Sequence, residues 1–117
     1  MDGHAIVIAD AQGVIQLWSR GAETLFGHVA RDVVGQPLEC IVPDEYREAH
    51  RQCFARAMES GVAGGEGVAF ELPVGCAGGV SVFPGMFVLV RDASTTVIGA
   101  MAIFTAPKSG GSQAAVT

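Results

Sequence analysis

The sequence predicts an α+β domain in which an antiparallel sheet carries helices on one face. Two short strand-like segments joined by a tight turn open the chain, an amphipathic helix occupies residues 43–61, and three strand-like segments follow it. Short hairpin connections make neighbouring strands antiparallel. Helices grouped between two hairpin regions, rather than alternating with single strands, are typical of the α+β class.

Length and composition indicate one compact domain with a short tail. Of the 117 residues, 50% are hydrophobic and 16% are charged, which is enough apolar material for a core. We expect the domain to span residues 1–106. Residues 107–117 are rich in Ser, Gly and Ala and are expected to form a disordered polar tail.

Charge and cysteine content exclude several classes of function. The net charge is -5 and no Lys/Arg cluster is present, so a nucleic-acid partner is not expected. Apolar runs are much shorter than the about 20 residues needed to span a membrane, so no membrane partner is expected. The three cysteines form no C-x-x-C pair, which favours reduced thiols and a cytoplasmic location.

The first half of the chain predicts a hairpin followed by short helices. Gly13 suits a positive φ in the turn after Asp10, and Ser19 is a helix N-cap residue with Glu23 near the start of the helix. Gly27 ends that helix. The expected elements are strands at 4–9 and 14–18, helical segments at 19–25 and 29–34, and an apolar connector at 38–42.

The second half predicts three strands. A glycine-rich link at 63–67 follows the long helix, and alternating apolar residues then indicate half-buried strands. Pro84-Gly85 is expected to bend or bulge the middle strand. The expected strands are 68–72, 80–90 and 96–105, joined by turns at 75–79 and 91–94.

The helix at 43–61 places a histidine in its apolar stripe. Asp44 and Glu45 suit the N-terminal end of the helix, where the helix dipole is positive, and Gly61 suits the position that ends the helix at its C-terminus. A histidine aimed inward is either a core residue that bonds a backbone carbonyl or a ligand. The stripe, spaced for about 3.6 residues per turn, consists of Tyr46, Ala49, His50, Cys53, Phe54 and Ala57.

The sequence does not predict an enzyme. It contains no nucleophile elbow, no phosphate-binding glycine loop and no Ser/His/Asp set. The carboxylates Asp32, Asp44, Glu45 and Glu48 fit a solvated helical surface better than a catalytic pair.

Several short motifs, in their order and spacing across residues 4–105, resemble the PAS sensor family. They are Asp10-x-x-Gly13-x-Ile15, Ala22–Gly27, Val34-Gly35, Ile41–Pro43, Gly79 with Phe83-Pro84, and Arg91-Asp92 with Val97–Gly99. The resemblance implies a five-stranded antiparallel sheet in the order 2-1-5-4-3, with the helices on one face. It also implies a pocket between the sheet and the long helix, and a role in signal transduction as a sensory box.

Within that family the chain is similar to the haem-binding sensors of the FixL type. The similarity lies in Gln16–Ser19, Ala22-Glu23, Leu25–Gly27 and Pro43 followed by Arg47 and His50. It implies haem b as a cofactor, with His50 as the proximal ligand to the iron. The expected cofactor-binding residues are His50, Tyr46, Cys53 and Phe54 on the helix, and Phe70, Leu72, Phe87, Leu89, Met101 and Ile103 on the strands. The small residues Gly99, Ala100 and Ala102 would leave room for a flat group.

One departure from that branch bears on ligand preference. Such sensors often carry an arginine on the strand after the long helix, and this chain has none between Arg56 and Arg91. An apolar distal side favours carbon monoxide or nitric oxide over oxygen, because bound oxygen draws more on a hydrogen-bond donor.

Other functions within the PAS family stay open. A cofactor-free module would serve for dimerisation or protein–protein contact, or would bind an unknown apolar small molecule. We expect a homodimer in either case, with an effector domain or partner protein that is not in this chain.

Overall fold

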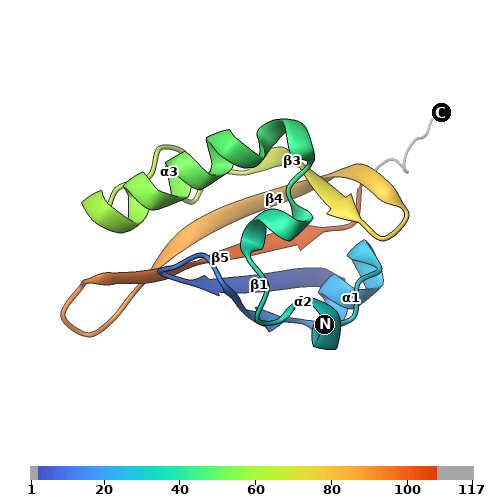
Figure 1. The fold of residues 1–117 in the computed structure, drawn as a ribbon, viewed down its shortest axis with the longest axis horizontal. Coiled ribbons are helices and arrows are strands. Elements are labelled where there is room, and N and C mark those ends of the chain that lie inside the picture. The colour runs from blue at the N-terminus through green and yellow to red at the C-terminus, as the bar shows by residue number, and fades with distance from the viewer. Residues whose placement is uncertain (1–2, 108–117) are drawn as a thin grey trace.

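A computed structural model describes residues 3–107 and shows one five-stranded antiparallel sheet with helices on one face (Figure 1). The strand order is β2-β1-β5-β4-β3. Both the predicted fold class and the predicted order are therefore confirmed. The elements are β1 (His4–Asp10), β2 (Ile15–Trp18), α1 (Arg20–Phe26), α2 (Ala30–Val33), the 3₁₀ turns η1 (Leu38–Ile41) and η2 (Asp44–Tyr46), α3 (Arg47–Ser60), β3 (Phe70–Cys76), β4 (Gly79–Arg91) and β5 (Val97–Thr105).

The hairpin between β1 and β2 is fixed by the side chain of Asp10. Its Oδ1 accepts hydrogen bonds from the backbone N–H of Gln12 at 2.9 Å and of Val14 at 3.0 Å. Gly13 has φ 81°, which a residue with a side chain rarely adopts. The Asp10-x-x-Gly13 pattern thus forms the predicted turn, because an aspartate can bond the backbone a few residues ahead of it.

Helix α1 begins and ends as the sequence predicts. The Ser19 hydroxyl accepts from the N–H of Ala22 at 3.1 Å and also from the N–H of Ile6 in β1 at 2.9 Å. The cap therefore stabilises the helix and joins it to the sheet. Gly27 ends the helix with φ 86°, and a Cβ at this position would press on the side chain of Ala77.

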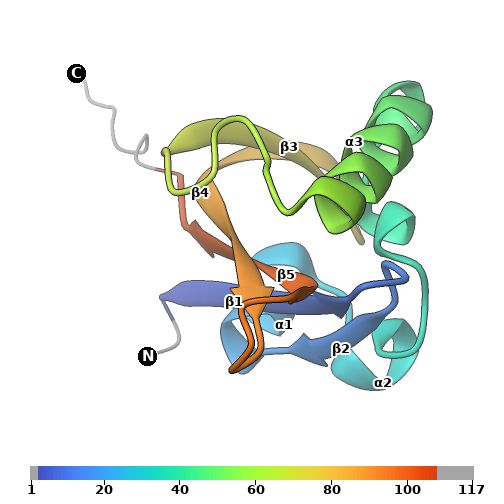
Figure 2. The ribbon, with the colours of Figure 1, turned by 90° about the vertical axis from the view of Figure 1, so that its left-hand side faces the viewer.

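The core lies between α1, α2 and the sheet and is centred on aromatic rings. Phe26 is 1% exposed. Its ring packs edge-on against Phe83, with centroids 4.9 Å apart, and against Phe104 at 5.2 Å. The other fully buried members include Ala5, Val7, Ile15, Trp18 and Ala22. Figure 2 shows α1 and α2 beside β1 and β2, away from the longer helix α3.

Strand β3 is longer than predicted and ends later. The turn expected at 75–79 is reduced to Ala77 and Gly78, because Gly75 pairs with Val80 and Cys76 pairs with Gly79 in the ladder with β4. Gly75 is typical of a turn, but its pairing with Val80 across the hairpin makes it part of the strand.

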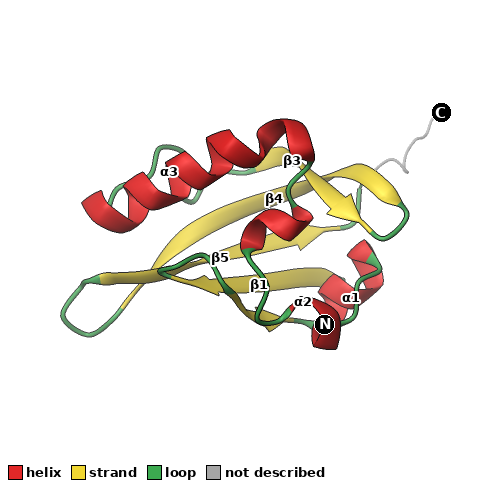
Figure 3. Cartoon of the chain, in the orientation of Figure 1, coloured by secondary structure: helices red, strands yellow, loops and turns green. Residues whose placement is uncertain are grey.

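The predicted helix at 43–61 is present in two parts, η2 and α3. Pro43 is extended, with ψ 145°, and Gly61 ends α3 with φ 75°. Ala57 is the buried residue of α3, so most of the apolar stripe does not pack on side chains of the sheet. Figure 3 shows α3 standing beside β3 and β4. None of the helices between residues 3 and 107 is long and apolar enough to cross a membrane. The tail expected from residue 107 lies, apart from Pro107, outside the described residues.

Candidate ligand-binding site

A chamber of about 700 Å³ lies between α3 and the sheet. This volume falls within the about 300–1,000 Å³ of small-molecule sites. The chamber is bounded by α3, the connector before it, the segment after it and the inner face of β1, β3, β4 and β5. Its lining is mainly apolar, so its occupant should be mainly apolar too.

Small residues of β5 form part of the sheet side of the chamber. Ala100 and Ala102 line it, together with Val7 and Ala9 of the neighbouring β1. Gly99 has another role, since a Cβ there would collide with the carbonyl oxygen of Ala9. Of the three small residues expected to leave room for a flat group, two line the chamber and Gly99 permits close contact between β5 and β1.

Most of the residues expected at a cofactor site do line this chamber. They are His50, Tyr46, Cys53, Phe54, Leu72, Phe87 and Leu89, together with Met101. Met101 borders the chamber through its place in β5, but its side chain alternates with those of Ala100 and Ala102 and so projects to the opposite face of the sheet. The structure places two others elsewhere. Ile103 pairs with Ile6 and Met86, on the opposite face of the sheet from Ala102. Phe70 is 45% exposed, and its ring lies against Gly65.

The connector before α3 also belongs to the site, which the sequence did not predict. Leu38, Ile41, Val42 and Pro43 all line the chamber. The available signal was the apolar run at 38–42 directly before the long helix. That run predicts only a connector, whereas in the structure it forms one wall of the chamber.

His50 lies at the rim of the chamber in contact with a carboxylate. Its Nδ1 is 3.1 Å from Oε2 of Glu39 in η1, and the side chains are 35% and 16% exposed, respectively. The imidazole also stacks on Phe54, with ring centroids 6.2 Å apart and planes 22° from parallel. His50 therefore faces the chamber and bonds a side chain, rather than a backbone carbonyl in the core. The sequence alone did not predict Glu39 as part of the site.

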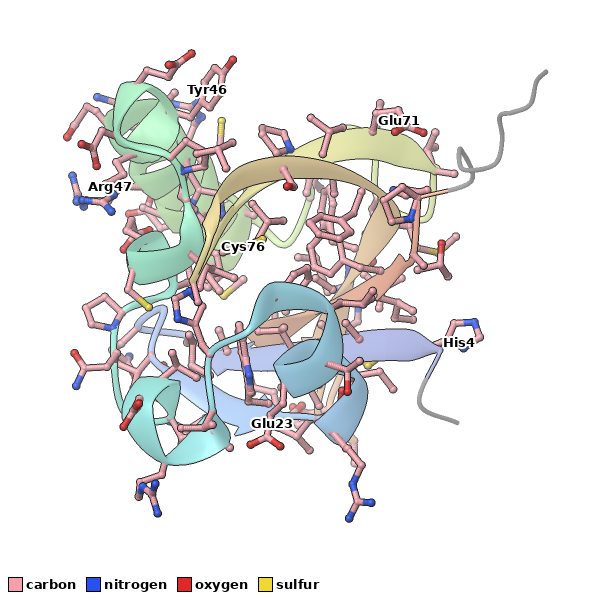
Figure 4. The ribbon with its side chains drawn as sticks, turned by 90° about the vertical axis from the view of Figure 1, so that its right-hand side faces the viewer. His4, Glu23, Tyr46, Arg47, Glu71 and Cys76 are labelled. Atoms are coloured by element: carbon pink, nitrogen blue, oxygen red, sulfur yellow. The ribbon has the colours of Figure 1, made fainter. Side chains whose placement is uncertain are left out.

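Polar groups of the chamber gather on the side of α3. Tyr46 is 47% exposed, and its ring points away from the sheet (Figure 4). A hydrogen bond to the Glu45 carboxylate raises the pKa of the Tyr46 phenol. Arg56 also lines the chamber. The chamber thus combines an apolar sheet side with His50 and Arg56 along the helix, while the Tyr46 ring points away from the sheet.

The segment after α3 closes another side and is held to the sheet by three hydrogen bonds. Oε2 of Glu66 accepts from the N–H of Leu89 at 2.8 Å, and the N–H of Gly67 donates to the carbonyl of Phe87 at 2.9 Å. Arg91 donates from Nη2 to the carbonyl of Gly61 at 2.9 Å. The first two bonds satisfy backbone groups of β4 where β3 no longer pairs with it, and the third joins the Arg91 side chain to the end of α3.

Two of the three cysteines have thiols that burial keeps protonated. Burial raises the pKa of the Cys40 and Cys76 thiols, which disfavours their ionised forms. No group of three or more His, Cys, Asp or Glu residues suited to a metal ion occurs within residues 3–107.

Comparison with known proteins places this architecture in a family. A sequence model of the PAS fold matches residues 2–107. The chain belongs to the PAS family. PAS domains are in general sensory modules rather than catalysts, and this PAS domain has the architecture of a sensory, signal-transducing one. The family prediction is confirmed.

Solved structures agree with this PAS fold. A PAS domain of a Colwellia psychrerythraea protein superposes with a TM-score of 0.72 and 26% identity, covering 88% of this chain and 85% of that one. The PAS domain of the Cronobacter turicensis RpfR quorum-sensing receptor, in complex with C12:0, gives a TM-score of 0.66 at 20% identity, covering 89% and 93%.

Sequence relatives match over about half of this PAS domain. An uncharacterized protein of Azorhizobium caulinodans is 40% identical over 58 residues, and the sensor protein FixL of Bradyrhizobium diazoefficiens is 35% identical over 52 residues. The matches cover 49% and 44% of this chain, but only 8% and 10% of the two relatives.

Proposed function

We propose that this PAS domain is a sensory module that binds haem b in the chamber, with His50 as the proximal ligand to the iron. The observation that carries the proposal is the place of His50, on the chamber lining with its Nδ1 on Glu39. A histidine that binds a metal through one ring nitrogen usually donates the other N–H to a carboxylate, a carbonyl or water.

The remaining lining fits a flat, mostly apolar cofactor with acidic groups. Ala100 and Ala102 leave space on the sheet side, and Phe87 and Leu89 supply apolar walls. Arg56 offers a positive charge for carboxylates. When bound, haem supplies an iron that takes up gases or changes redox state. The apolar strand side favours carbon monoxide or nitric oxide over oxygen. The partial similarity to the FixL sensor supports the same interpretation.

We expect purified protein given haem to show a Soret band that His50→Ala abolishes, because a haem without its axial protein ligand is not held in a defined site. Absorbance spectroscopy after removal of free haem measures this. His4→Ala is the matched control, since His4 is exposed at the start of β1, away from the chamber. A wild-type protein that retains no haem would contradict the proposal.

A second candidate is an apolar small molecule with one acidic end. The RpfR PAS domain is in complex with C12:0, and the present chamber likewise pairs apolar walls with a basic side chain, Arg56. Native mass spectrometry with added C12:0 tests this candidate. A bound mass of one fatty acid, without haem uptake, would favour it over haem.

We also propose that the module forms a homodimer through the outer face of its sheet. The register aligns Leu17, Ile8, Met101 and Val88 in one row, and Ile6, Ile103 and Met86 in the next. These side chains point away from the buried residues of β1. A two-fold axis brings the same apolar patch of two copies together. Changes in the chamber would then reach a partner subunit or an effector outside this chain.

Ile103→Asp is expected to convert the dimer to a monomer, because it places a charge in the centre of this face. Light scattering coupled to gel filtration measures the mass. Val34→Asp is the control, since Val34 is 42% exposed and follows α2. A wild-type monomer, or an Ile103→Asp dimer, would contradict the proposed interface.

A further inference from the structure

We infer that Glu39 is a positioning residue that holds His50 with Nδ1–H toward its carboxylate and leaves Nε2 free to bind the ligand in the chamber. This inference deepens the proposed function and rests on it. Glu39 is not part of the apolar stripe or of the resemblance to haem sensors. Its role follows only from the contact that its side chain makes with His50, which joins η1 to α3.

The Glu39–His50 contact differs from the ion pairs of the helical region. Arg47–Asp44 and Arg51–Glu48 join residues three apart within one helical segment. Such exposed pairs contribute little to stability. Glu39 and His50, in contrast, are 11 residues apart and join η1 to α3, and the Glu39 side chain is mostly buried.

The backbone around Glu39 is held in place independently of His50. The N–H of Leu38 donates to the carbonyl of Gly13 at 2.7 Å, and Pro37 bridges to Val14. The N–H of Val42 donates to the carbonyl of Glu39 at 3.0 Å. The carboxylate is therefore presented from a segment anchored on the β1–β2 hairpin. An anchored acceptor restricts the orientation of the ring that it bonds.

The chemistry of the imidazole then decides which nitrogen meets the ligand. A neutral imidazole has one N–H donor and one acceptor nitrogen. A carboxylate accepts only, so Nδ1 carries the proton and Nε2 carries the lone pair. Within residues 3–107 no protein group forms a hydrogen bond with Nε2. An anionic partner also makes the imidazole a stronger electron donor, which favours ferric over ferrous iron.

The tautomer of His50 is measurable without haem. Long-range ¹H–¹⁵N correlation spectra of the apoprotein, recorded where His50 is neutral, are expected to show Nδ1 protonated and Nε2 unprotonated. Glu39→Ala should give a mixture of tautomers. Glu39→Gln keeps an acceptor oxygen and should retain the Nδ1–H form. An Nε2–H tautomer in the wild type would overturn the inference.

Haem binding gives the second measurement. Glu39→Ala should lower haem affinity by about 10–100-fold and raise the midpoint potential, whereas Glu39→Gln should raise the potential with a smaller loss of affinity. The control is Glu71→Gln, because Glu71 is exposed on β3, where Figure 4 shows its side chain at the surface, and it does not line the chamber. Unchanged affinity and potential in Glu39→Ala would overturn the inference.

The two proposals fail in different ways. If the wild type takes up no haem, the haem proposal is wrong, and the tautomer of the apoprotein still decides the role of Glu39. If the wild type binds haem and the Glu39 variants match it, the haem proposal stands and the role of Glu39 is wrong.

Discussion

Phe26→Ala is expected to lower the free energy of unfolding by about 3–5 kcal/mol, the range for truncating a buried phenylalanine. Phe26 is fully buried and meets three other aromatic rings, those of Trp18, Phe83 and Phe104. Edge-on pairs add to the energy of burial. The variant would also lose the ring contacts by which α1 packs against Phe83 of β4 and Phe104 of β5. Since small domains are stable by about 5–15 kcal/mol, this loss is a large share of the total stability.

Denaturant unfolding followed by the fluorescence of Trp18 measures this loss. Phe70→Ala is the matched control, because it removes the same atoms from a ring that is 45% exposed. That variant should lose less than about 1 kcal/mol, as most surface substitutions do. Equal losses in the two variants would show that the aromatic cluster is not the centre of the core.

Ala102→Phe is expected to weaken binding in the chamber by at least about 100-fold, equivalent to about 2.7 kcal/mol. Ala102 lies in register between Val7 and Phe87, both of which line the chamber. A phenyl ring at this position projects into the volume that haem or a fatty acid would use. The steric conflict acts on the ligand, and because Ala102 also packs against the core cluster, thermal unfolding is measured alongside binding.

The measurement is haem or C12:0 retention together with thermal unfolding. The ring is expected to fill existing space, so the folded domain should persist. Ala55→Phe, on an exposed position of α3, is the control and should bind as the wild type does. Retained affinity in Ala102→Phe would show that the ligand does not occupy this chamber.

Local signals explain why so much of the fold was predictable. Asp10, Gly13, Ser19 and Gly27 act on neighbours within a few residues, so the sequence alone specifies the turn and the helix ends. The full extent of β3 was not predictable in this way. It depends on the ladder with β4, which lets Gly75 continue a strand.

The part of the site that lies on one helix was predictable from the sequence. The part that depends on strand register, or on contacts between separate elements, was less predictable. The stripe of α3 correctly places His50 and Phe54 on the chamber. The register of β5 decides that Ala102 faces inward and Ile103 outward, and register is not visible in one strand. Glu39 was missed because its contact with His50 arises only when η1 and α3 are brought together.

Strand β5 serves two surfaces at once. Ala100 and Ala102 line the chamber, while Ile103, between Ala102 and the buried Phe104, belongs to the outer rows. Because alternate residues of one backbone project to opposite sides, no occupant can displace this strand on the inside without displacing the apolar rows on the outside. Ligand binding and subunit contact would thus depend on the same strand. A displacement of β5 by the ligand would reach the subunit interface across the thickness of one sheet.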